Sequence, residues 1–310
     1  MIMYLRQILI NELEYPAVLS DKISVFHDMD FLSMYLPYIR LVGIYNENNE
    51  LIGVFYYFKK SKYFLKYIIP PPFHPYNGLI FHNSAQKEES RNSFIKELQY
   101  LIHQYFTEKE NAHYIRFVLS PEHIDTQIFR WNKWSVKVNY TYQLSLKSST
   151  NELFENLSSE KRKSIRKAEK DGIVVKETEN YDTVKELILK TFERQKKKIN
   201  VFYLNKILQE WANPSNSFAF VAYSDEKPVA ATFCLYDHST AYYLMGGYDF
   251  QNTHHGAGVS CMWHSILKSK ELGLDIFDFE GSMLPNVERY FRDFGGKLIP
   301  YFVCEKWRLF

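Results

Sequence analysis

Two stretches of the chain repeat one pattern: an apolar strand, a polar turn and a longer apolar strand. Residues 41–58 read LVGIYNENNELIGVFYYF, and residues 220–236 read FVAYSDEKPVAATFCLY. When Tyr45 is aligned with Tyr223, the polar turns that follow them coincide. Apolar runs on both sides of a short polar turn predict a β-hairpin. Because any two hairpins share this pattern, a duplicated fold also requires the same order of elements after each of them.

The order of elements after the two hairpins is indeed the same. In the first half we predict a helix over 87–106 and a strand over 114–119, followed by an aromatic stretch. In the second half we predict a helix over 259–272 and a strand over 275–279. A short helix over 286–294 and a strand over 298–307 come next. These elements predict a duplicated fold of the α/β or α+β class.

The chain of 310 residues is long enough for two domains of about 150 residues each. The predicted boundary lies near residue 148, where the polar run KSSTN interrupts the apolar pattern. Ser149 and Glu152 form the S-x-x-E pattern of a helix capping box, so we expect a helix to begin there, just after a strand over 140–146. The predicted domains are residues 1–148 and 149–310.

Composition argues against several classes of protein. A net charge of only +2 argues against a nucleic-acid coat protein, and Cys234, Cys261 and Cys304 form no C-x-x-C pair. We therefore expect buried thiols rather than disulfides or a zinc site. His254 and His255 are adjacent, so their side chains tend to point apart, and no metal site is predicted. The chain starts without a basic signal-peptide front and has no apolar run of about 18 residues, so we expect a cytoplasmic protein with no membrane span.

A strongly basic helix is predicted over residues 157–172, LSSEKRKSIRKAEKDG, with a serine to cap its start and a glycine to end it. Its basic residues include Lys161, Arg162 and Arg166, and a second basic cluster follows at 194–198. Such a surface can bind the phosphates of a nucleotide ligand or an RNA backbone. The alternative is the solvated charged face of an ordinary helix.

A glycine-rich loop joins a predicted strand at 241–245 to the helix that follows it. Glycines let the backbone approach a ligand closely, and free N–H groups at a helix start attract phosphate. Without a ligand, the same glycines would form only a bulge and a turn. The predicted ligand-binding residues are Leu244, Met245, Gly246, His255, Gly256, Ala257 and Gly258.

Two acidic residues follow one another on a largely apolar strand, DIFDFEG at 275–281. With the period of two of a β-strand, Asp278 and Glu280 face the same side. Neighbouring carboxylates raise one of the two pKa values, which suits a general base near neutral pH. The alternative is structural, in which these acids hold a loop or an arginine such as Arg289 or Arg292.

The residues described so far resemble the FemAB/FemX-like branch of the GNAT acyltransferase superfamily. The matching stretches in the second half are RKSIRKAEKDGI from Arg162, AYYLMGGYD from Ala241, GAG at Gly256, DFEG at Asp278 and YFRDFGG at Tyr290. The first half is similar more loosely, through its hairpin and through PPPFHPYNGL from Pro70. The resemblance implies two tandem GNAT-like domains, each a mixed, mostly antiparallel sheet flanked by helices, with the donor site in the second domain and a cleft between the two.

This resemblance also implies a chemistry, the transfer of an acyl or aminoacyl group to an amine. The donor would be acyl-CoA, such as acetyl-CoA, or aminoacyl-tRNA. Backbone N–H groups on the strand near Leu244 would stabilise the oxyanion, and Asp278 or Glu280 would take the amine proton. Arg292 would balance charge or hold a phosphate. In the first half, Tyr76 and Asn77 would bind the acceptor.

The chain departs from the family pattern at two positions. Thr253 stands where the GNAT pyrophosphate signature usually has Gln or Arg, and Phe291-Arg292 replaces a Phe-Lys pair. Three functions are therefore weighed: an acyl-CoA-dependent N-acyltransferase, an aminoacyl-tRNA-dependent transferase acting on a cell-wall precursor or peptide, and a non-catalytic binding module. The default expectation for the oligomeric state is a monomer.

Overall fold

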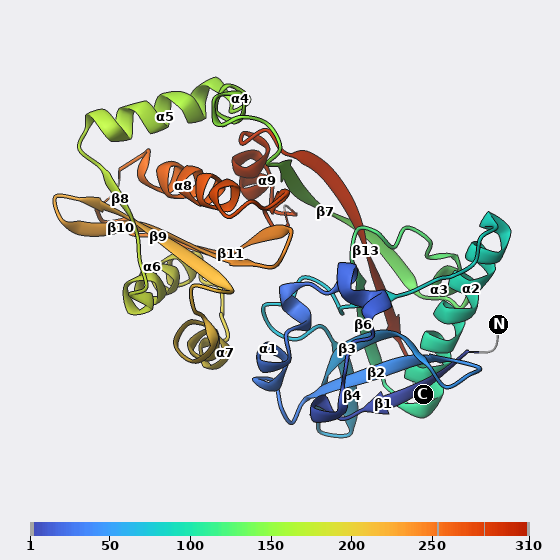
Figure 1. The fold of residues 1–310 in the computed structure, drawn as a ribbon. Helices are drawn as coiled ribbons and strands as arrows, with labels where there is room; N and C mark the ends of the chain where they lie inside the picture. Colours follow the sequence, from blue (N-terminus) through green and yellow to red (C-terminus); the bar gives the residue numbers. More distant parts are fainter. Residues whose placement is uncertain (1–2, 253, 282, 309–310) are drawn as a thin grey trace. The chain divides into compact units, whose positions relative to one another are not determined.

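The computed structural model describes residues 3–252, 254–281 and 283–308. The chain divides into two compact units. Unit 1 contains Met1–Asn139 and Pro300–Phe310, and unit 2 contains Tyr140–Ile299. Strands β7, Ser135–Ser145, and β13, Lys297–Trp307, each begin in one unit and end in the other (Figure 1). The division into domains at residues 148 and 149 stays a prediction.

Unit 1 is built on a mixed sheet with the strand order β1-β2-β3-β4-β6-β13, and β5 pairs with β3. Among the strand pairs of this unit that the structure describes, only β4 and β6 run parallel. The strands are β1 Met3–Ile8, β2 Ile39–Asn46, β3 Leu51–Lys62, β4 Leu65–Ile69, β5 Ile80–Phe81 and β6 Tyr114–Leu119. The α-helices are α1 Met29–Ser33, α2 Glu88–Gln104 and α3 Gln127–Trp131.

Aromatic rings fill the core of unit 1. Phe55 of β3 lies 5.7 Å from both Phe106 and Phe117, measured between ring centroids, and all three are fully buried. Phe94 and Leu98 present the apolar face of α2 to the same cluster. Burying each such side chain contributes about 1.5–3 kcal/mol, so this cluster fixes α2 on the sheet.

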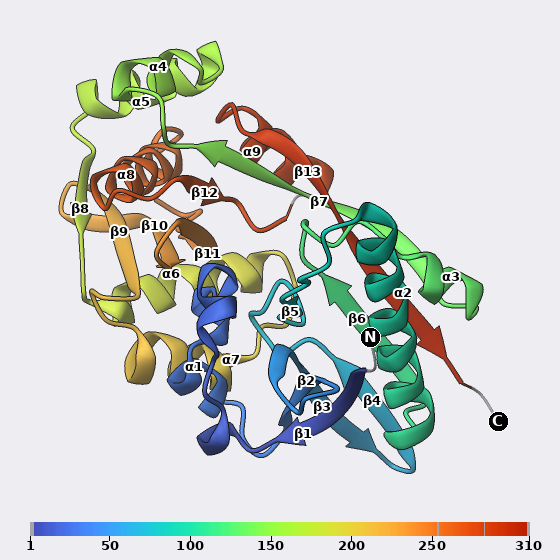
Figure 2. The same ribbon diagram turned by 45° about the vertical axis from the view of Figure 1, so that its right-hand side comes forward.

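Unit 2 repeats this plan with the strand order β7-β12-β11-β10-β9-β8. Helices α5 and α8 lie on one side of its sheet and α6 on the other (Figures 1 and 2). The strands are β8 Val174–Glu177, β9 Ser217–Ser224, β10 Lys227–Tyr236, β11 Thr240–Tyr248 and β12 Ile276–Asp278. The α-helices are α4 Thr150–Glu155, α5 Ser159–Lys170, α6 Tyr181–Arg194, α7 Val201–Asn205, α8 Ala257–Glu271 and α9 Pro285–Arg292.

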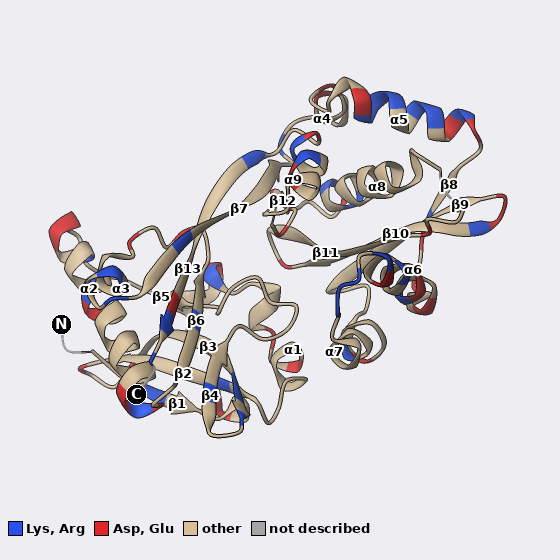
Figure 3. Ribbon diagram, turned by 180° about the vertical axis from the view of Figure 1, so that it is seen from behind, with Lys and Arg blue, Asp and Glu red and all other residues tan. Residues whose placement is uncertain are grey.

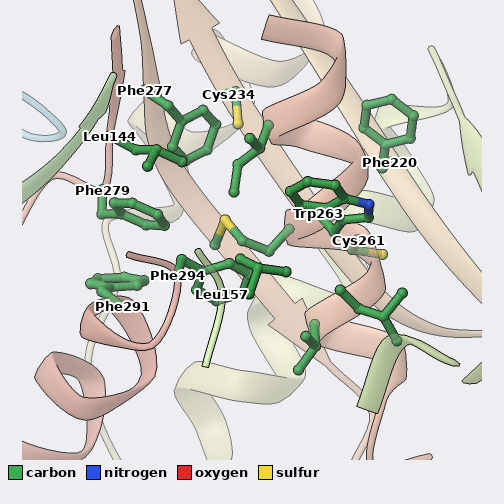
Figure 4. Close-up of a cluster of buried hydrophobic side chains, with 14 of the residues drawn as sticks. Leu144, Leu157, Phe220, Cys234, Cys261, Trp263, Phe277, Phe279, Phe291 and Phe294 are labelled. Atoms are coloured by element: carbon green, nitrogen blue, oxygen red, sulfur yellow. The ribbon is translucent and has the colours of Figure 1, made fainter. Parts of the chain in front are cut away.

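A ring cluster anchors the segment between β12 and α9. The centroid of Phe279 lies 5.0 Å from that of Phe277, 5.1 Å from that of Phe291 and 5.7 Å from that of Phe294 (Figure 4). All four rings are buried. Because the rings alternate with acidic residues along 277–280, their burial determines where the two carboxylates stand.

The predicted repeat is confirmed in the strand pairing. Both predicted hairpins form, as β2–β3 and β9–β10, and each is followed by a parallel pair, β4–β6 or β11–β12. The capping box of Ser149 and Glu152 is present at the start of α4. The predicted helices and strands after each hairpin are observed within two residues of their expected starts, except the strand expected from residue 140, which begins at Ser135. The mixed α/β class is confirmed. The next strand in each sheet is distant in sequence, because β6 pairs with β13 and β12 pairs with β7.

Candidate donor and catalytic site

Strands β11 and β12 separate after a short parallel ladder. Their pairing ends at Tyr242 with Asp278, whereas β11 continues to Tyr248. On its other edge β11 pairs with β10, and a register shift leaves Leu244 without a partner there, which defines a β-bulge. Beyond Tyr242, the described part of the chain therefore offers β11 no continuing strand on the β12 side.

Three sequence-predicted residues lie on this continuing part of β11. Met245 is buried, whereas Leu244 and Gly246 are half-buried. At Gly246 a Cβ atom would lie 1.8 Å from the hydroxyl of Tyr243, so a larger residue would require the Tyr243 side chain to shift. Backbone groups on a strand edge with no neighbouring strand can bind an extended ligand through main-chain hydrogen bonds.

Helix α8 begins after a loop that His254 organises. The imidazole Nδ1 of His254 accepts a hydrogen bond from the N–H of Gly256 at 3.1 Å, and its Nε2 lies 3.0 Å from Asp171 Oδ2. The hydroxyl of Tyr248 donates to the carbonyl of His254 at 2.7 Å. His255, which the sequence predicted as a binding residue, is exposed. Thr253 lies outside the described residues.

Two backbone N–H groups in the first turn of α8 have no acceptor among the described residues. No residue that the structure describes accepts a hydrogen bond from the N–H of Gly258 or Val259. The positive end of the helix dipole lies at the same place, because α8 runs for 15 residues from Ala257. Free N–H groups at a helix start suit a phosphate.

The two glycines of the G-x-G motif differ in their surroundings. A Cβ atom on Gly256 would meet the carbonyl oxygen of Ser164 at 2.4 Å and Ala168 Cβ at 2.8 Å, because α5 crosses the start of α8 there. A Cβ atom on Gly258 would meet nothing closer than 3.9 Å. Gly256 is therefore needed for helix packing, whereas the protein's own packing leaves Gly258 open.

Asp278 is held as a hydrogen-bond acceptor. Its side chain is buried and accepts from Thr141 Oγ1 at 2.6 Å, from Gln143 Nε2 at 2.8 Å and from the N–H of Glu280 at 2.8 Å. Burial raises the pKa of Asp278, and these three donors oppose that rise. Both Thr141 and Gln143 come from β7, so Asp278 ties β7 to the end of β12.

Glu280 stands in a different environment. Its φ angle is +58°, in the left-handed region, because β12 ends at Asp278 and the chain turns. The expectation that Asp278 and Glu280 face one side of a continuing strand is therefore wrong. The Oε1 atom of Glu280 is buried and has no hydrogen-bond partner among the described residues. Burial raises the pKa of Glu280 well above its usual value, and the charge of Asp278 adds to the rise.

Arg292 lies on α9 and is already paired. Its Nη1 atom lies 3.2 Å from Glu288 Oε1, and its side chain is more than half exposed. The same carboxylate oxygen accepts from the hydroxyl of Tyr142 at 2.7 Å. Arg289 lies 3.8 Å from Glu160, so neither arginine forms an ion pair with Asp278 or Glu280 in the described part of the chain.

The basic helix contributes to packing as well as to the surface. Lys161 is buried, with its Nζ atom 3.9 Å from the ring centroid of Tyr290, and burial lowers its pKa. Arg162 donates to the carbonyl of Leu157 at 2.7 Å. Arg166 lies over the ring of Phe154 at 5.4 Å. Figure 3 shows that basic residues nevertheless extend along α5.

Tyr76 and Asn77, the two residues of the first half that the sequence predicted to bind the acceptor, differ in their burial. Asn77 is fully buried, and its amide donates to the carbonyl of Tyr56 at 3.1 Å and accepts from the N–H of Val118 at 2.7 Å. Its side chain is thus used to bridge β3 and β6. Tyr76 is half-buried and packs edge-on against Tyr301 at 5.4 Å.

Sequence patterns did not reveal the residues that support these groups. Thr141 and Gln143 belong to a strand that is far from Asp278 in the chain, and His254 reads only as one of two adjacent histidines. Tyr290 donates to the carbonyl of Gly258 at 3.0 Å and so covers the start of α8. The only available signal was the position of Tyr290 in the YFRDFGG stretch.

Two further properties bear on the chemistry. Within residues 3–252, 254–281 and 283–308, no three His, Cys, Asp or Glu side chains are grouped so that they could hold a metal ion. Over the same residues, no helix has both the length and the apolar character needed to cross a bilayer.

Comparison with known families and structures identifies the fold. Residues 156–292 match the family model of the acetyltransferase (GNAT) domain. The chain therefore contains a GNAT-type domain, which includes β11, the glycine-rich loop, α8 and both carboxylates. No curated protein matches the chain.

Solved structures similar to the chain extend this likeness over most of its length. FemX superposes with a TM-score of 0.59 at 12% identity, over 86% of this chain and 87% of FemX. L-PGS from Bacillus licheniformis gives 0.56 at 13% identity, over 94% and 90%. A tandem GNAT protein from the clavulanic acid biosynthesis pathway gives 0.54 at 8% identity, over 98% of both chains. The chain has a GNAT/Fem-like fold, as its sequence motifs indicated.

Proposed function

We propose that this chain is an N-acyltransferase that binds acyl-CoA in unit 2 and transfers the acyl group to an amine. The observation that carries the proposal is the juxtaposition at the end of β12. There β11 loses its parallel neighbour at the same point where Glu280 holds a buried carboxylate oxygen that no described residue binds.

The donor is proposed to bind along β11 and at the start of α8. Its pyrophosphate would accept hydrogen bonds from the N–H groups of Gly258 and Val259, and Gly258 has the open space that a close approach requires. The pantetheine arm is an extended chain of amides, which suits the strand edge beyond Tyr242. The acyl carbonyl would lie near the bulge at Leu244, where backbone N–H groups can stabilise an oxyanion.

In the proposed reaction the amine attacks the thioester carbonyl carbon and forms a C–N bond. Glu280 accepts the proton that the amine loses, and the C–S bond breaks to release CoA as a thiolate, which is then protonated. The raised pKa of Glu280 makes its carboxylate a better base than an ordinary glutamate. Asp278 acts as a positioning residue, because it binds the backbone N–H of Glu280 and two side chains of β7.

A second donor, aminoacyl-tRNA, is favoured by one observation. Lys163 and Lys170 of α5 are both exposed and form no ion pair with a described residue. Basic side chains of this kind contact RNA phosphates. With this donor, the amine would attack the ester carbonyl of aminoacyl-tRNA instead of a thioester carbonyl, and Glu280 would keep its proposed role as the base.

Donor binding separates the two versions. The melting temperature of the full chain would be measured with acetyl-CoA, with CoA and with an aminoacyl-tRNA mixture. A donor at about 100 times its Kd stabilises the protein by about 2.7 kcal/mol, which corresponds to a rise of several degrees. The variant Gly258→Val should lose the rise with acetyl-CoA, whereas Glu271→Gln at the far end of α8 should keep it.

Each outcome of these melting-temperature measurements supports a different function. A rise with acetyl-CoA that Gly258→Val abolishes supports the acyl-CoA enzyme, and radiolabelled acetyl transfer to a panel of amines follows. A rise with aminoacyl-tRNA alone moves the proposal to the second donor. No rise with any donor, together with no turnover, leaves only a non-catalytic binding module.

A further inference from the structure

The hairpin between β3 and β4 ends in two exposed aromatic rings. The last pair of the ladder joins Lys62 to Leu65, so the turn consists of Tyr63 and Phe64 alone. Tyr63 is 89% exposed and Phe64 is 70% exposed. No other aromatic side chain of the described residues is as exposed as either of them.

Local preference does not explain this turn. Tyr63 has a φ angle of +55°, in the left-handed region, where two-residue hairpin turns strongly favour Gly, Asn or Asp. A bulky residue is strained in that region. Most of both rings nevertheless remains in water, although Lys62 Nζ lies over the Tyr63 ring, 5.8 Å from its centroid. The folding of unit 1 therefore gains little from aromatic residues at this position.

Lysines without a carboxylate partner among the described residues flank the two rings. Lys59 is paired with Glu110, but Lys60, Lys62 and Lys66 form no ion pair with any residue that the structure describes. Lys60 and Lys62 are exposed at the end of β3, and Lys66 is half-buried on β4. Figure 3 shows basic residues on this hairpin beside the label β4.

We propose that this hairpin tip, Lys60–Lys66, docks on the surface of an anionic lipid membrane. Tyr and Phe rings are favoured at the level of the lipid headgroups, and the lysines are attracted to anionic lipids. A two-residue tip presents a convex point that can enter the interface without unfolding. This role goes beyond the acyl transfer proposed above and does not depend on it.

Single-stranded RNA is the less suitable partner for the same residues. Proteins that bind single strands combine a basic groove with a series of aromatic platforms along it. The tip has two adjacent rings at the end of one turn and no such series. Charge and shape therefore favour a flat, anionic lipid surface.

Vesicle co-sedimentation with the full chain tests the proposal. One set of vesicles is phosphatidylcholine alone, and the other is an equimolar mixture of phosphatidylcholine and phosphatidylglycerol. The chain should sediment with the mixed vesicles, and binding should weaken in about 1 M salt, where the Debye length falls to about 3 Å.

Two variants separate the aromatic and the basic contributions. The double variant Tyr63→Gly/Phe64→Asn places residues that two-residue hairpin turns favour at the tip, so its melting temperature should equal or exceed that of the wild type. Its affinity for the mixed vesicles should nevertheless fall about tenfold or more, because both rings are lost. The triple variant Lys60→Gln/Lys62→Gln/Lys66→Gln should lose about 100-fold affinity for the mixed vesicles. As a matched control, Ile124→Ser removes a side chain that is 75% exposed in the same unit and has acidic neighbours, and it should bind like the wild type.

Several outcomes would overturn the proposal. One is a wild-type chain that sediments with neither vesicle, and another is a Tyr63→Gly/Phe64→Asn variant that binds as well as the wild type. A third is binding to an oligouridine strand, without vesicle binding, that this variant abolishes. A fourth is self-association of the chain that depends on the tip, since the rings would then cover a second copy.

Discussion

Replacing the two carboxylates one at a time should damage two different properties of the protein. Asp278 accepts three hydrogen bonds, and Asp278→Asn places an amide donor where at least one of those donors now points. Hydrogen bonds to a charged group contribute about 1.5–3 kcal/mol each. Losing one or two of them costs about 3 kcal/mol, and at about 2–4 °C per kcal/mol the melting temperature should fall by about 6–12 °C.

Glu280→Gln should leave the fold intact and reduce turnover. No described residue binds Glu280 Oε1, so the substitution breaks no hydrogen bond at that atom. Loss of a general base typically costs about 10²–10⁴-fold in rate. The assay is kcat/KM for acyl transfer, measured beside the melting temperature for both variants.

The pH dependence provides an independent readout. In the wild type, kcat/KM should rise with pH as Glu280 deprotonates, at a pH well above the usual range for glutamate, and the Gln variant should lack this rise. Between the unfolded and the raised folded pKa, the folded state binds more protons than the unfolded state. Stability therefore falls as pH rises through this window, and Glu280→Gln should remove that slope.

Two results would refute the assignment. Turnover of Glu280→Gln within about tenfold of wild type would show that the reaction does not need this base, since positioning alone can then supply the rate. An Asp278→Asn variant that keeps its melting temperature but loses turnover would give the catalytic role to Asp278 instead.

Three further substitutions test the surroundings of the donor site. Gly256→Ala places a Cβ atom 2.4 Å from the Ser164 carbonyl oxygen, so the melting temperature should fall by an amount equivalent to about 1–3 kcal/mol, as a thermal melt would show. Gly258→Ala has room for its Cβ atom and should stabilise α8 by about 0.5–1 kcal/mol, yet calorimetry should show weaker binding of acetyl-CoA. Arg162→Gln loses a charged hydrogen bond to the Leu157 carbonyl and should cost about 1.5–3 kcal/mol of stability. Its Kd for acetyl-CoA should stay at the wild-type value, and a large change would assign Arg162 to the donor site.

Short-range patterns in the sequence were enough to predict a large part of the fold. The capping box at Ser149, the two hairpins and the glycine that follows α5 are patterns of adjacent residues, and each is read from short-range chemistry. The order of these elements was enough to predict the duplication. The tandem GNAT structure that resembles the chain over nearly its whole length agrees with that prediction.

Features that depend on distant residues could not be predicted in the same way. Strand periodicity indicates that 298–307 is a strand but does not say that it pairs with β6. Alternation placed Asp278 and Glu280 on one face, because nothing in DFEG shows that the strand ends after Asp278.

The basic helix shows a further limit. Lysine is almost always exposed, so Lys161 was assigned to a surface patch. Its ammonium group instead lies on the ring of Tyr290, which is remote in sequence and brought there by α9. The roles assigned to the residues of the candidate site stay predictions until the variants above are measured.

The pairing of β6 with β13 has a consequence for the synthesis of the chain. The ribosome completes β6 at Leu119 but must translate nearly all of unit 2 before β13 begins at Lys297. At about 5–20 residues per second, this leaves an edge of β6 without its native partner for ~10–35 s. During that interval the largely apolar strand YIRFVL is an open edge, which favours pairing with other nascent chains. Production of this protein should therefore be sensitive to the speed of translation and to chaperones that cover open strands.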